Sequence, residues 1–442
     1  MNTGREPRAA AGSPAGAAAA DLPGPEEALR RLLEHPDFAA AAAALAAEEP
    51  EDVPLEEALG RVLACDIAAP EDMPPFPRAH MDGFAVRAAD CAGASAERPV
   101  RLRLAPAVAM GRAAGELAPG TAAPIATGGM LPAGADAVVP VEEAEAAGDA
   151  VAIFAPVAPG QHVTPAGADA RAGERLLPSG RRLRPYDIAA LAAVGRLRVP
   201  VRRRPRLLIL PTGDELVPAE RAPAPGQIRE FNSWGLAAAA RRDGAEARVQ
   251  AAVPDDADAL AAALAEAARE HEAVAVIGGS SVGARDWTAA AVRRLPGPGV
   301  LVHGVAMRPG RPTLVALVHA DGRRPRPVFG LPGHPVSCLV VYDTLVRPAL
   351  RRLLGAAGGP PPSVRARLAR PLSNGALEFV ARVELRPTGE GGPVAWEAWP
   401  VPGDSAILTS LARADGILRL PPHRSLEPGS VVEVELLRPP AF

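Results

Sequence analysis

Short apolar runs and helical segments alternate through the middle of the chain. Apolar runs at 206–210, 247–253 and 273–277 have the length of buried strands, and segments of helical composition at 232–243 and 256–270 lie between them. Later strands are expected near 301–305, 313–318 and 327–331, with helices over 286–295 and up to about Leu354. This alternation predicts a parallel-type α/β domain.

The N-terminal part of the chain has a different pattern. Residues 25–45 have helical composition, and we expect Pro36 to break or kink the helix. Residues 54–63 are predicted to form a second short helix, because a proline and two glutamates lie near its start. A third helix is expected over 185–194, and it should end at Gly195.

Two further regions have the pattern of small β domains. From 100 to 157, short β-like runs alternate with glycine and proline turns. Beyond a Gly/Pro linker at 358–362, strands separated by turns continue to the end of the chain. Both regions are therefore predicted to be β-rich.

Composition and charge limit the classes of protein. The chain has 442 residues, which predicts two to four domains. A net charge of -3 gives no general attraction to nucleic acid, and no apolar run has the roughly 18–20 residues that span a membrane. The three cysteines are scattered and odd in number, which favours a reducing cytoplasm. All 48 basic residues are arginine.

Four polar turns follow expected strand ends of the α/β domain. They are 211–215 (PTGDE), 278–283 (GGSSVG), 307–312 (MRPGRP) and 331–337 (LPGHPVS). Open α/β sheets bind ligands at the carboxyl ends of their strands, and glycine turns expose N–H groups that attract anions. Any one of these turns is equally well explained as a plain strand-to-helix connection. Together, on one sheet edge, they predict a pocket for an anionic ligand, with carboxylates available for a divalent cation such as Mg²⁺.

Two more motifs lie outside the α/β domain. Asp82-Gly83 follows a proline-rich stretch and is typical of a hairpin corner. Thr127-Gly128-Gly129 has the residues to hold a phosphate or a sugar hydroxyl, and a tight β-turn accounts for it as well. The residues alone leave both interpretations open.

Taken together, the motifs resemble those of the molybdopterin molybdenumtransferase family, which includes the bacterial MoeA proteins and the E domain of gephyrin. The matching segments are 79–86 (AHMDGFAV), Thr127-Gly128, 212–216 (TGDEL), 226–228 (GQI) with Asn232, 278–283 with Asp286, 308–312 (RPGRP) and 332–337 (PGHPVS). They occur in family order and cover roughly Pro25 to the end, so an accidental likeness is excluded.

The resemblance implies a homodimer of four-domain protomers. Its expected parts are a disordered tail (1–22), a discontinuous helical dimerisation domain (23–67 and 166–200), a β-rich second domain (68–165), an α/β domain related to molybdopterin adenylyltransferases (201–357) and a C-terminal β-barrel (363–442). A molybdopterin adenylyltransferase is a further expected partner.

The resemblance also implies a reaction, in which molybdate is inserted into adenylylated molybdopterin and AMP is released. Molybdate is expected at Arg308, Arg311 and Ser337. Asp214, Glu215 and Asp286 are the expected catalytic carboxylates and Mg²⁺ ligands. The rest of the substrate is expected on Gly278, Gly279, Ser280, Ser281, Gly283 and Asn232. Asp82 and Thr127 would act from the partner protomer.

The chain departs from the family pattern at several positions. Arg308 and Arg311 stand where lysine is usual, and His334 stands where asparagine is usual. Three alternatives remain beside molybdate insertion: a paralogue that inserts tungstate, a molybdopterin adenylyltransferase and a scaffold that binds molybdopterin without catalysis. The presence of Asp82, Asp214, Glu215 and Asp286 favours an enzyme.

Overall fold

The computed structural model describes residues 21–279, 286–319, 324–389 and 394–438. The chain divides into two compact units. One consists of residues 52–201, and the other of 1–51 together with 202–442. Each unit has its own hydrophobic core.

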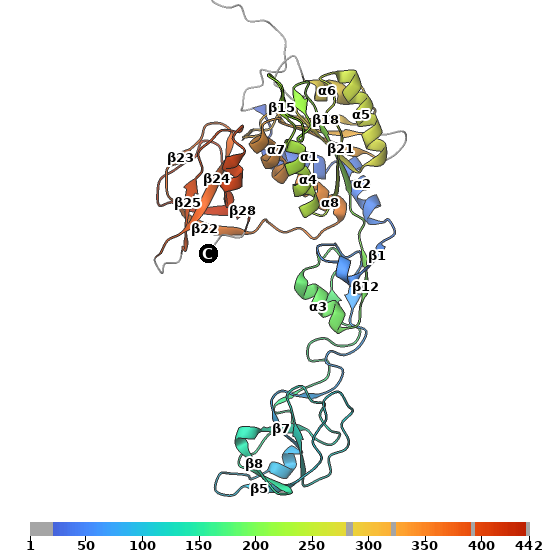
Figure 1. Ribbon diagram of the computed structural model, residues 1–442, viewed down its shortest axis with the longest axis vertical. Helices are drawn as coiled ribbons and strands as arrows, with labels where there is room; N and C mark the ends of the chain where they lie inside the picture. Colours follow the sequence, from blue (N-terminus) through green and yellow to red (C-terminus); the bar gives the residue numbers. More distant parts are fainter. Residues whose placement is uncertain (1–20, 280–285, 320–323, 390–393, 439–442) are drawn as a thin grey trace, which may run out of the picture. The chain divides into compact units, whose positions relative to one another are not determined.

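A six-stranded sheet is the centre of the larger unit (Figure 1). Its order is β16 (Glu246–Val249), β13 (Arg206–Pro211), β17 (Ala273–Ile277), β21 (Arg326–Leu331), β20 (Leu314–Val318) and β18 (Gly299–His303). The first four strands are parallel, as the alternating pattern predicts. The last two are antiparallel to their neighbours, because the connections from β18 to β20 and from β20 to β21 are too short for a parallel crossover.

Helices cover both faces of this sheet. On one face lie α4 (Asn232–Arg242), α7 (Pro335–Val341), the π-helical segment η6 (Tyr342–Val346) and α8 (Arg347–Leu354); on the other lie α5 (Ala257–Glu270) and α6 (Trp287–Val292). Leu207 and Ile209 belong to the first core cluster, and Leu208 and Leu210 to the second. This is the two-sided burial expected of a central parallel strand.

The N-terminal helices α1 (Pro25–Leu33) and α2 (Pro36–Ala46) pack into the core of the α/β domain. Leu32 and Phe38 are buried there. The two helices are separate, as expected from Pro36, which is the first residue of α2. The apolar faces of α1 and α2 contact helix α8 and the sheet.

A second six-stranded sheet forms most of the smaller unit. Its order is β7 (Ala137–Pro140), β4 (Gly83–Val86), β6 (Thr121–Ile125), β5 (Val100–Leu104), β9 (Ala150–Ile153) and β8 (Ala144–Ala147). Strand β4 packs so closely on β7 that a Cβ at Gly83 would lie 2.0 Å from the Val139 carbonyl oxygen. Glycine is therefore required beside Asp82.

The rest of the smaller unit holds one α-helix, α3 (Pro185–Ala193), at the predicted place. The helix predicted over 54–63 is wrong. That segment forms β1 (Glu51–Pro54), the 3₁₀ turn η3 (Leu55–Glu57) and an irregular stretch. Its backbone N–H groups bond to distant carbonyls, including Leu55 to Leu197 and Leu63 to Arg181, and these long-range bonds replace the helical ones.

Several short elements complete residues 52–201. They are β2 (Ile67–Ala68), β3 (Arg78–Ala79), η4 (Ala88–Cys91), η5 (Val141–Glu143), β10 (Val163–Thr164), β11 (Arg175–Leu177) and β12 (Arg198–Val201).

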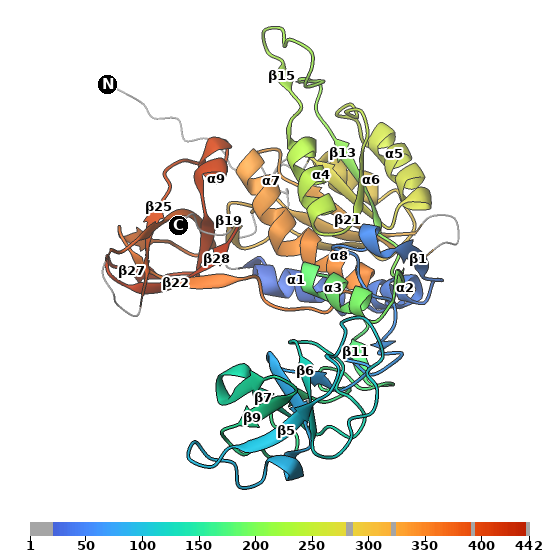
Figure 2. The same ribbon diagram turned by 60° about the horizontal axis from the view of Figure 1, so that its bottom comes forward.

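The C-terminal region is a closed five-stranded barrel, as predicted (Figure 2). Its strands are β22 (Ser363–Leu368), β25 (Trp396–Pro400), β24 (Glu378–Pro387), β26 (Gly416–Leu420) and β28 (Val431–Leu436). Pairing of β24 with β26 and of β28 with β22 closes the ring. The short strand β19 (Met307–Arg308) joins β24 in parallel and ties the barrel to the α/β domain.

The barrel region also contains β23 (Leu372–Ser373), β27 (Ser425–Leu426) and the short helix α9 (Thr409–Arg413), and the α/β domain contains β14 (Leu216–Val217) and β15 (Ile228–Arg229). None of the helices in the described part of the chain is both long and apolar enough to cross a membrane.

Candidate functional site

Three of the predicted glycine turns meet at the carboxyl edge of the α/β sheet. The turn after β13, the start of the turn after β17 and the turn after β21 line one small hollow, here called the central pocket. Its lining includes Thr212, Gly213, Glu215, Asn232, Gly278, Gly279 and Gly333. The predicted residues Ser280, Ser281 and Gly283 lie outside the described residues.

Gly278 and Gly279 are required at the floor of the central pocket. Both have positive φ, +89° and +61°. A Cβ at Gly278 would lie 2.8 Å from the Thr212 carbonyl oxygen, and one at Gly279 would lie 3.1 Å from the Thr288 hydroxyl. The Thr288 hydroxyl is buried and has no hydrogen-bond partner among the described residues. The chain therefore keeps this floor free of side chains.

Asn232 joins two of these turns. Its side-chain amide donates a hydrogen bond to the Gly333 carbonyl oxygen at 2.7 Å. As the first residue of α4, it fixes the start of this helix against the turn after β21. The predicted substrate residue thus also holds the pocket together.

The three predicted carboxylates differ in solvent exposure and in the hydrogen bonds that they accept. Asp214 and Glu215 are exposed; Asp214 accepts a long hydrogen bond of 3.4 Å from the Asp255 N–H, and the Glu215 carboxylate folds over Gly213. Asp286 has only 12% of its side chain exposed. One of its oxygens caps α6 by accepting from the Ala289 N–H at 2.9 Å, and the other lies 2.6 Å from His303 Nε2.

Asp214 and Glu215 fit a Mg²⁺ site that is completed by the phosphates of a substrate. Among the described residues, no three acidic, histidine or cysteine side chains converge on one point. Mg²⁺ commonly binds through one or two carboxylates together with substrate phosphates. Asp214 and Glu215 fit that arrangement because both carboxylates are open to solvent.

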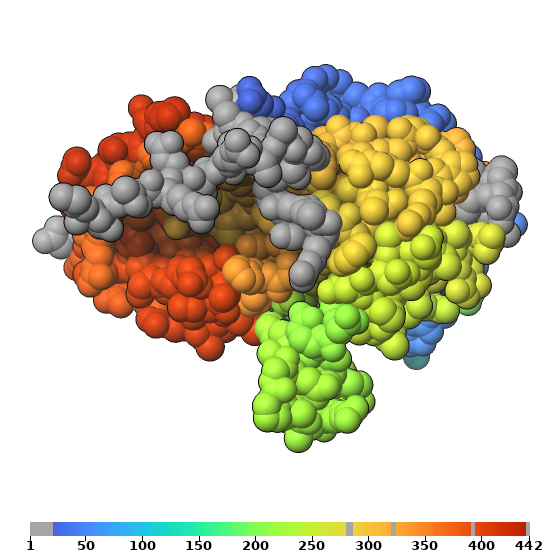
Figure 3. Space-filling model, turned by 90° about the horizontal axis from the view of Figure 1, so that it is seen from above, coloured from blue at the N-terminus to red at the C-terminus, as the bar shows by residue number. Residues whose placement is uncertain are grey.

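A larger hollow, here called the barrel-side pocket, lies between the α/β domain and the barrel, where Figure 3 shows a recess. Its volume is about 530 Å³, and it shares Gly333 with the central pocket. The predicted anion-binding residues Arg308, Arg311 and Ser337 all line it. The structure thus brings together three residues from two separate turns.

Arg382 is a third cation in the barrel-side pocket and was missed in the sequence. It lies on β24 and is only 5% exposed. Its guanidinium donates hydrogen bonds to the carbonyl oxygens of Gly403 and Asp404. Burial lowers the pKa of Arg382, since it disfavours the charged form. The signal in the sequence was a single charge among the buried residues of a strand.

His334 closes the barrel-side pocket from the other side. Its Nδ1 lies 2.7 Å from the Ser405 hydroxyl, and the Val336 N–H donates to the Ser405 carbonyl oxygen at 3.1 Å. Ser405 belongs to a barrel loop, and His334 is the residue directly before α7. The histidine that stands in place of the usual asparagine therefore connects the two domains beside the arginines.

Asp82 and Thr127 form a pair in the smaller unit. Asp82 Oδ1 accepts from the Thr127 N–H at 2.7 Å and from the Thr127 hydroxyl at 2.8 Å. The backbone bond, and then the hydroxyl bond, lowers the pKa of Asp82. The carboxylate remains exposed, so it is ionised and accessible at neutral pH.

The three cysteines are unlike the exposed Asp82 carboxylate, because two of them are buried. All three cysteines are free, and burial raises the pKa of Cys91 to about 11 and that of Cys338 to about 12. Both buried thiols are therefore unreactive near neutral pH.

Known proteins match the chain along nearly its whole length. Residues 24–195 match "MoeA N-terminal region (domain I and II)", 208–352 match "Probable molybdopterin binding domain" and 365–437 match "MoeA C-terminal region (domain IV)". The molybdopterin molybdenumtransferase of Bacillus subtilis (strain 168) is 36% identical over 401 residues, which cover 88% of this chain and 90% of that protein. Molybdopterin molybdenumtransferase 2 of Mycobacterium tuberculosis (strain ATCC 25618 / H37Rv) is 37% identical over 311 residues, 69% of this chain and 76% of that protein.

Solved structures agree with the sequence matches. The molybdopterin biosynthesis MoeA protein of Pyrococcus horikoshii OT3 superposes with a TM-score of 0.77 at 30% identity, covering 94% of this chain and 100% of that one. A second structure of a MoeA protein from Pyrococcus horikoshii gives a TM-score of 0.71 at 36% identity, covering 91% and 99%.

Proposed function

Because the chain belongs to the MoeA family of molybdopterin molybdenumtransferases, we propose that it inserts molybdate into adenylylated molybdopterin and releases AMP. Its place is then in molybdenum cofactor biosynthesis. In the reaction, water attacks the adenylyl phosphorus, the anhydride bond to the molybdopterin phosphate breaks, and AMP leaves with the oxygen of that water. The two dithiolene sulfurs bind the metal, and one molybdate oxygen leaves as water with the two thiol protons.

The observation that carries this proposal is the set of three arginines around one cavity. Arg308 and Arg311 come from one turn and Arg382 comes from a barrel strand, and all three line the barrel-side pocket beside Ser337. A tetrahedral oxyanion needs donors from several directions, and guanidinium groups supply charge and N–H donors together. Molybdate is such an anion.

The central pocket suits the phosphates of the substrate. Gly278 and Gly279 let a ligand approach the backbone closely, and Asp214 and Glu215 lie on the neighbouring turn. A Mg²⁺ ion held by these two carboxylates would neutralise phosphate charge during anhydride cleavage. One carboxylate oxygen of Asp286 accepts a hydrogen bond from the start of α6, and the other bonds to His303. A catalytic role for Asp286 is part of this proposal.

We further propose that the protein acts as a homodimer and that Asp82 and Thr127 serve the site of the partner protomer. The support is the geometry of the pair, an exposed carboxylate whose ionised form is stabilised by two hydrogen bonds. A cytoplasmic location and a molybdopterin adenylyltransferase partner that delivers the substrate belong to the same proposal.

The test is an AMP-release assay with adenylylated molybdopterin and Mg²⁺, run in parallel with molybdate and with tungstate. We expect AMP release that depends on the oxyanion. Faster release with tungstate would identify a tungstate-inserting protein. Intact substrate binding without AMP release under either oxyanion would reject the enzyme and favour the scaffold.

A further inference from the structure

A third hollow, here called the outer pocket, adjoins the central pocket. Its volume is about 440 Å³, which falls in the range of roughly 300–1,000 Å³ typical of small-molecule sites. It shares Pro211, Leu216 and Glu230 with the central pocket, and none of its lining residues belongs to the barrel-side pocket. The central pocket therefore lies between the other two.

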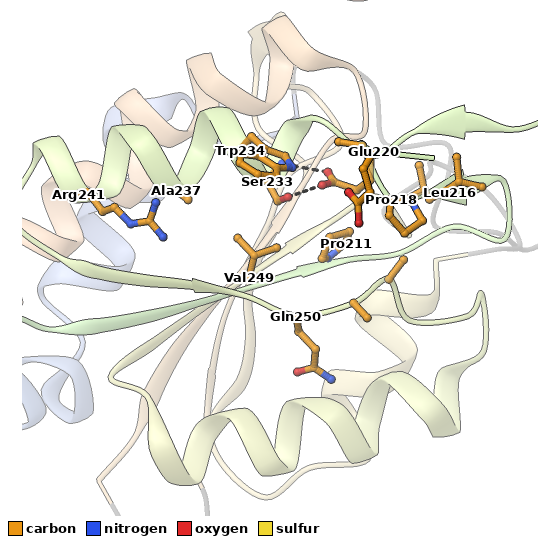
Figure 4. A pocket seen from close by; sticks show the side chains of 15 residues that line it. Pro211, Leu216, Pro218, Glu220, Ser233, Trp234, Ala237, Arg241, Val249 and Gln250 are labelled. Atoms are coloured by element: carbon orange, nitrogen blue, oxygen red, sulfur yellow. Dashed lines mark hydrogen bonds between the residues drawn. The ribbon is translucent and has the colours of Figure 1, made fainter. Parts of the chain in front are cut away.

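The walls of the outer pocket are largely apolar (Figure 4). Trp234, Ala237 and Arg241 lie along one side of α4, and Val249 faces them from the end of the edge strand β16. Pro218 lies on the projecting segment between β14 and β15, which is the light green lobe of Figure 3.

Two large apolar side chains on this pocket are exposed. Trp234 has 67% of its surface open, and Val249 has 45%. A tryptophan on a helix that packs into the core is expected to face inward unless its ring has another partner. The exposed indole offers a flat surface on which a planar ring can stack.

The charges of the outer pocket favour an uncharged group over a phosphate. Glu220 lines it and repels anions. Arg241 donates through Nη2 to the Ala247 carbonyl oxygen at 2.9 Å, so part of its donor capacity is committed to the wall.

We infer that the outer pocket binds the adenine base of the adenylylated substrate, with Trp234 stacked on the ring; this inference rests on the proposed function. The order of the three pockets supports it. An oxyanion site at one end, a glycine-lined middle and an aromatic pocket at the other end match the order of groups in the substrate: the dithiolene that receives molybdate, the phosphoanhydride and the purine. The predicted motifs account for the first two pockets and leave the third unassigned.

The test compares ligands with and without the base. AMP and ribose 5-phosphate are titrated into the intact protein by calorimetry. We expect AMP to bind at least about tenfold more tightly, because stacking of one base on an aromatic side chain has an effect of that size. Trp234→Ala should remove this preference, and Trp234→Phe should keep most of it. AMP should also quench tryptophan fluorescence in the wild type much more than in Trp234→Phe.

Two more variants keep the test decisive. Ala252→Trp adds a bulky ring at an exposed position of the pocket rim and should weaken AMP binding without changing ribose 5-phosphate binding. Tyr186→Ala removes an aromatic ring that is 80% exposed in the other unit, and it should change neither. Equal affinity for AMP and ribose 5-phosphate, or unchanged AMP binding in both Trp234→Ala and Ala252→Trp, would overturn the inference.

The inference and the proposed function fail in different ways. Base-dependent AMP binding that is lost in Trp234→Ala, combined with no AMP release from the full substrate, would support the pocket and reject the transferase activity. Oxyanion-dependent AMP release that is unaffected in rate and in KM by Trp234→Ala would keep the transferase and reject the pocket.

Discussion

Replacement of Arg382 by methionine tests the anion site at its most buried point. The side chain is 5% exposed, and its guanidinium bonds to the Gly403 and Asp404 carbonyl oxygens. Burial lowers the pKa of Arg382, so the charged form lacks much of the stabilisation that water gives it. A bound oxyanion would supply that stabilisation. Arg382→Met keeps the length of the side chain and removes the charge.

The size of the effect follows from the kind of bond that is lost. A hydrogen bond to a charged group contributes about 1.5–3 kcal/mol, which corresponds to about a ten- to hundredfold loss of affinity. We expect molybdate binding, measured by calorimetry, to weaken by this factor in Arg382→Met. Molybdate at 100 times its Kd should stabilise the wild type by about 2.7 kcal/mol and the variant much less at the same concentration.

The control for Arg382→Met lies four residues further along the same strand. Arg386 stacks on the ring of Trp399 and has 54% of its side chain exposed, and it does not line the barrel-side pocket. Arg386→Met should bind molybdate like the wild type. Equal molybdate affinity in Arg382→Met and the wild type would refute the role of Arg382. An equal loss in both variants would show a general charge effect instead.

Three further predictions concern other parts of the chain. Asp82→Ala should abolish AMP release while the dimer stays folded, as measured by light scattering and circular dichroism; retained activity would exclude Asp82 from the site. Phe38→Ala should cost about 3–5 kcal/mol and lower the melting transition of the α/β unit but not that of residues 52–201, because Phe38 is fully buried in the α/β core. Burial alone raises the pKa of Glu272, but hydrogen bonds and charge from Arg206 outweigh burial and lower this pKa. The ionised Glu272 therefore stabilises the fold above its ordinary pKa of about 4.5, and this stabilisation is lost as pH falls through the lowered pKa. Glu272→Gln should therefore cost about 3 kcal/mol at pH 7, and the difference from the wild type should shrink in acid denaturant titrations; a difference that does not change with pH would contradict the ion pair.

The sequence was most informative where local chemistry determines structure. Proline at the start of α2 and glycine after α3 fixed helix ends, and the glycine turns after the parallel strands converge because such strands end at one edge. Arg308 and Ser337 could therefore be placed in one site from their turns alone.

The features that the sequence did not predict depend on distant partners. The segment over 54–63 has helical composition, but its N–H groups bond to residues more than a hundred positions away. Arg382 lies within a strand and so has no turn motif around it, and its place in the barrel-side pocket depends on the contact between the barrel and the α/β domain. The bond between Asp286 and His303 also depends on a tertiary contact, since Asp286 precedes α6 and His303 ends strand β18.

The pairing of β19 with β24 ties the barrel to the proposed oxyanion site. Arg308 is paired with Phe379, and Arg382 follows three residues later on the same strand, so strand β24 connects two of the three cations. The spacing between them is set by backbone geometry and does not depend on how firmly two domain surfaces pack. The barrel is therefore not an exchangeable module. A chimera that takes its barrel from a relative should respect the pairing at Met307 and Arg308, and a chain cut at the linker before β22 should lose both this pairing and the proposed oxyanion site.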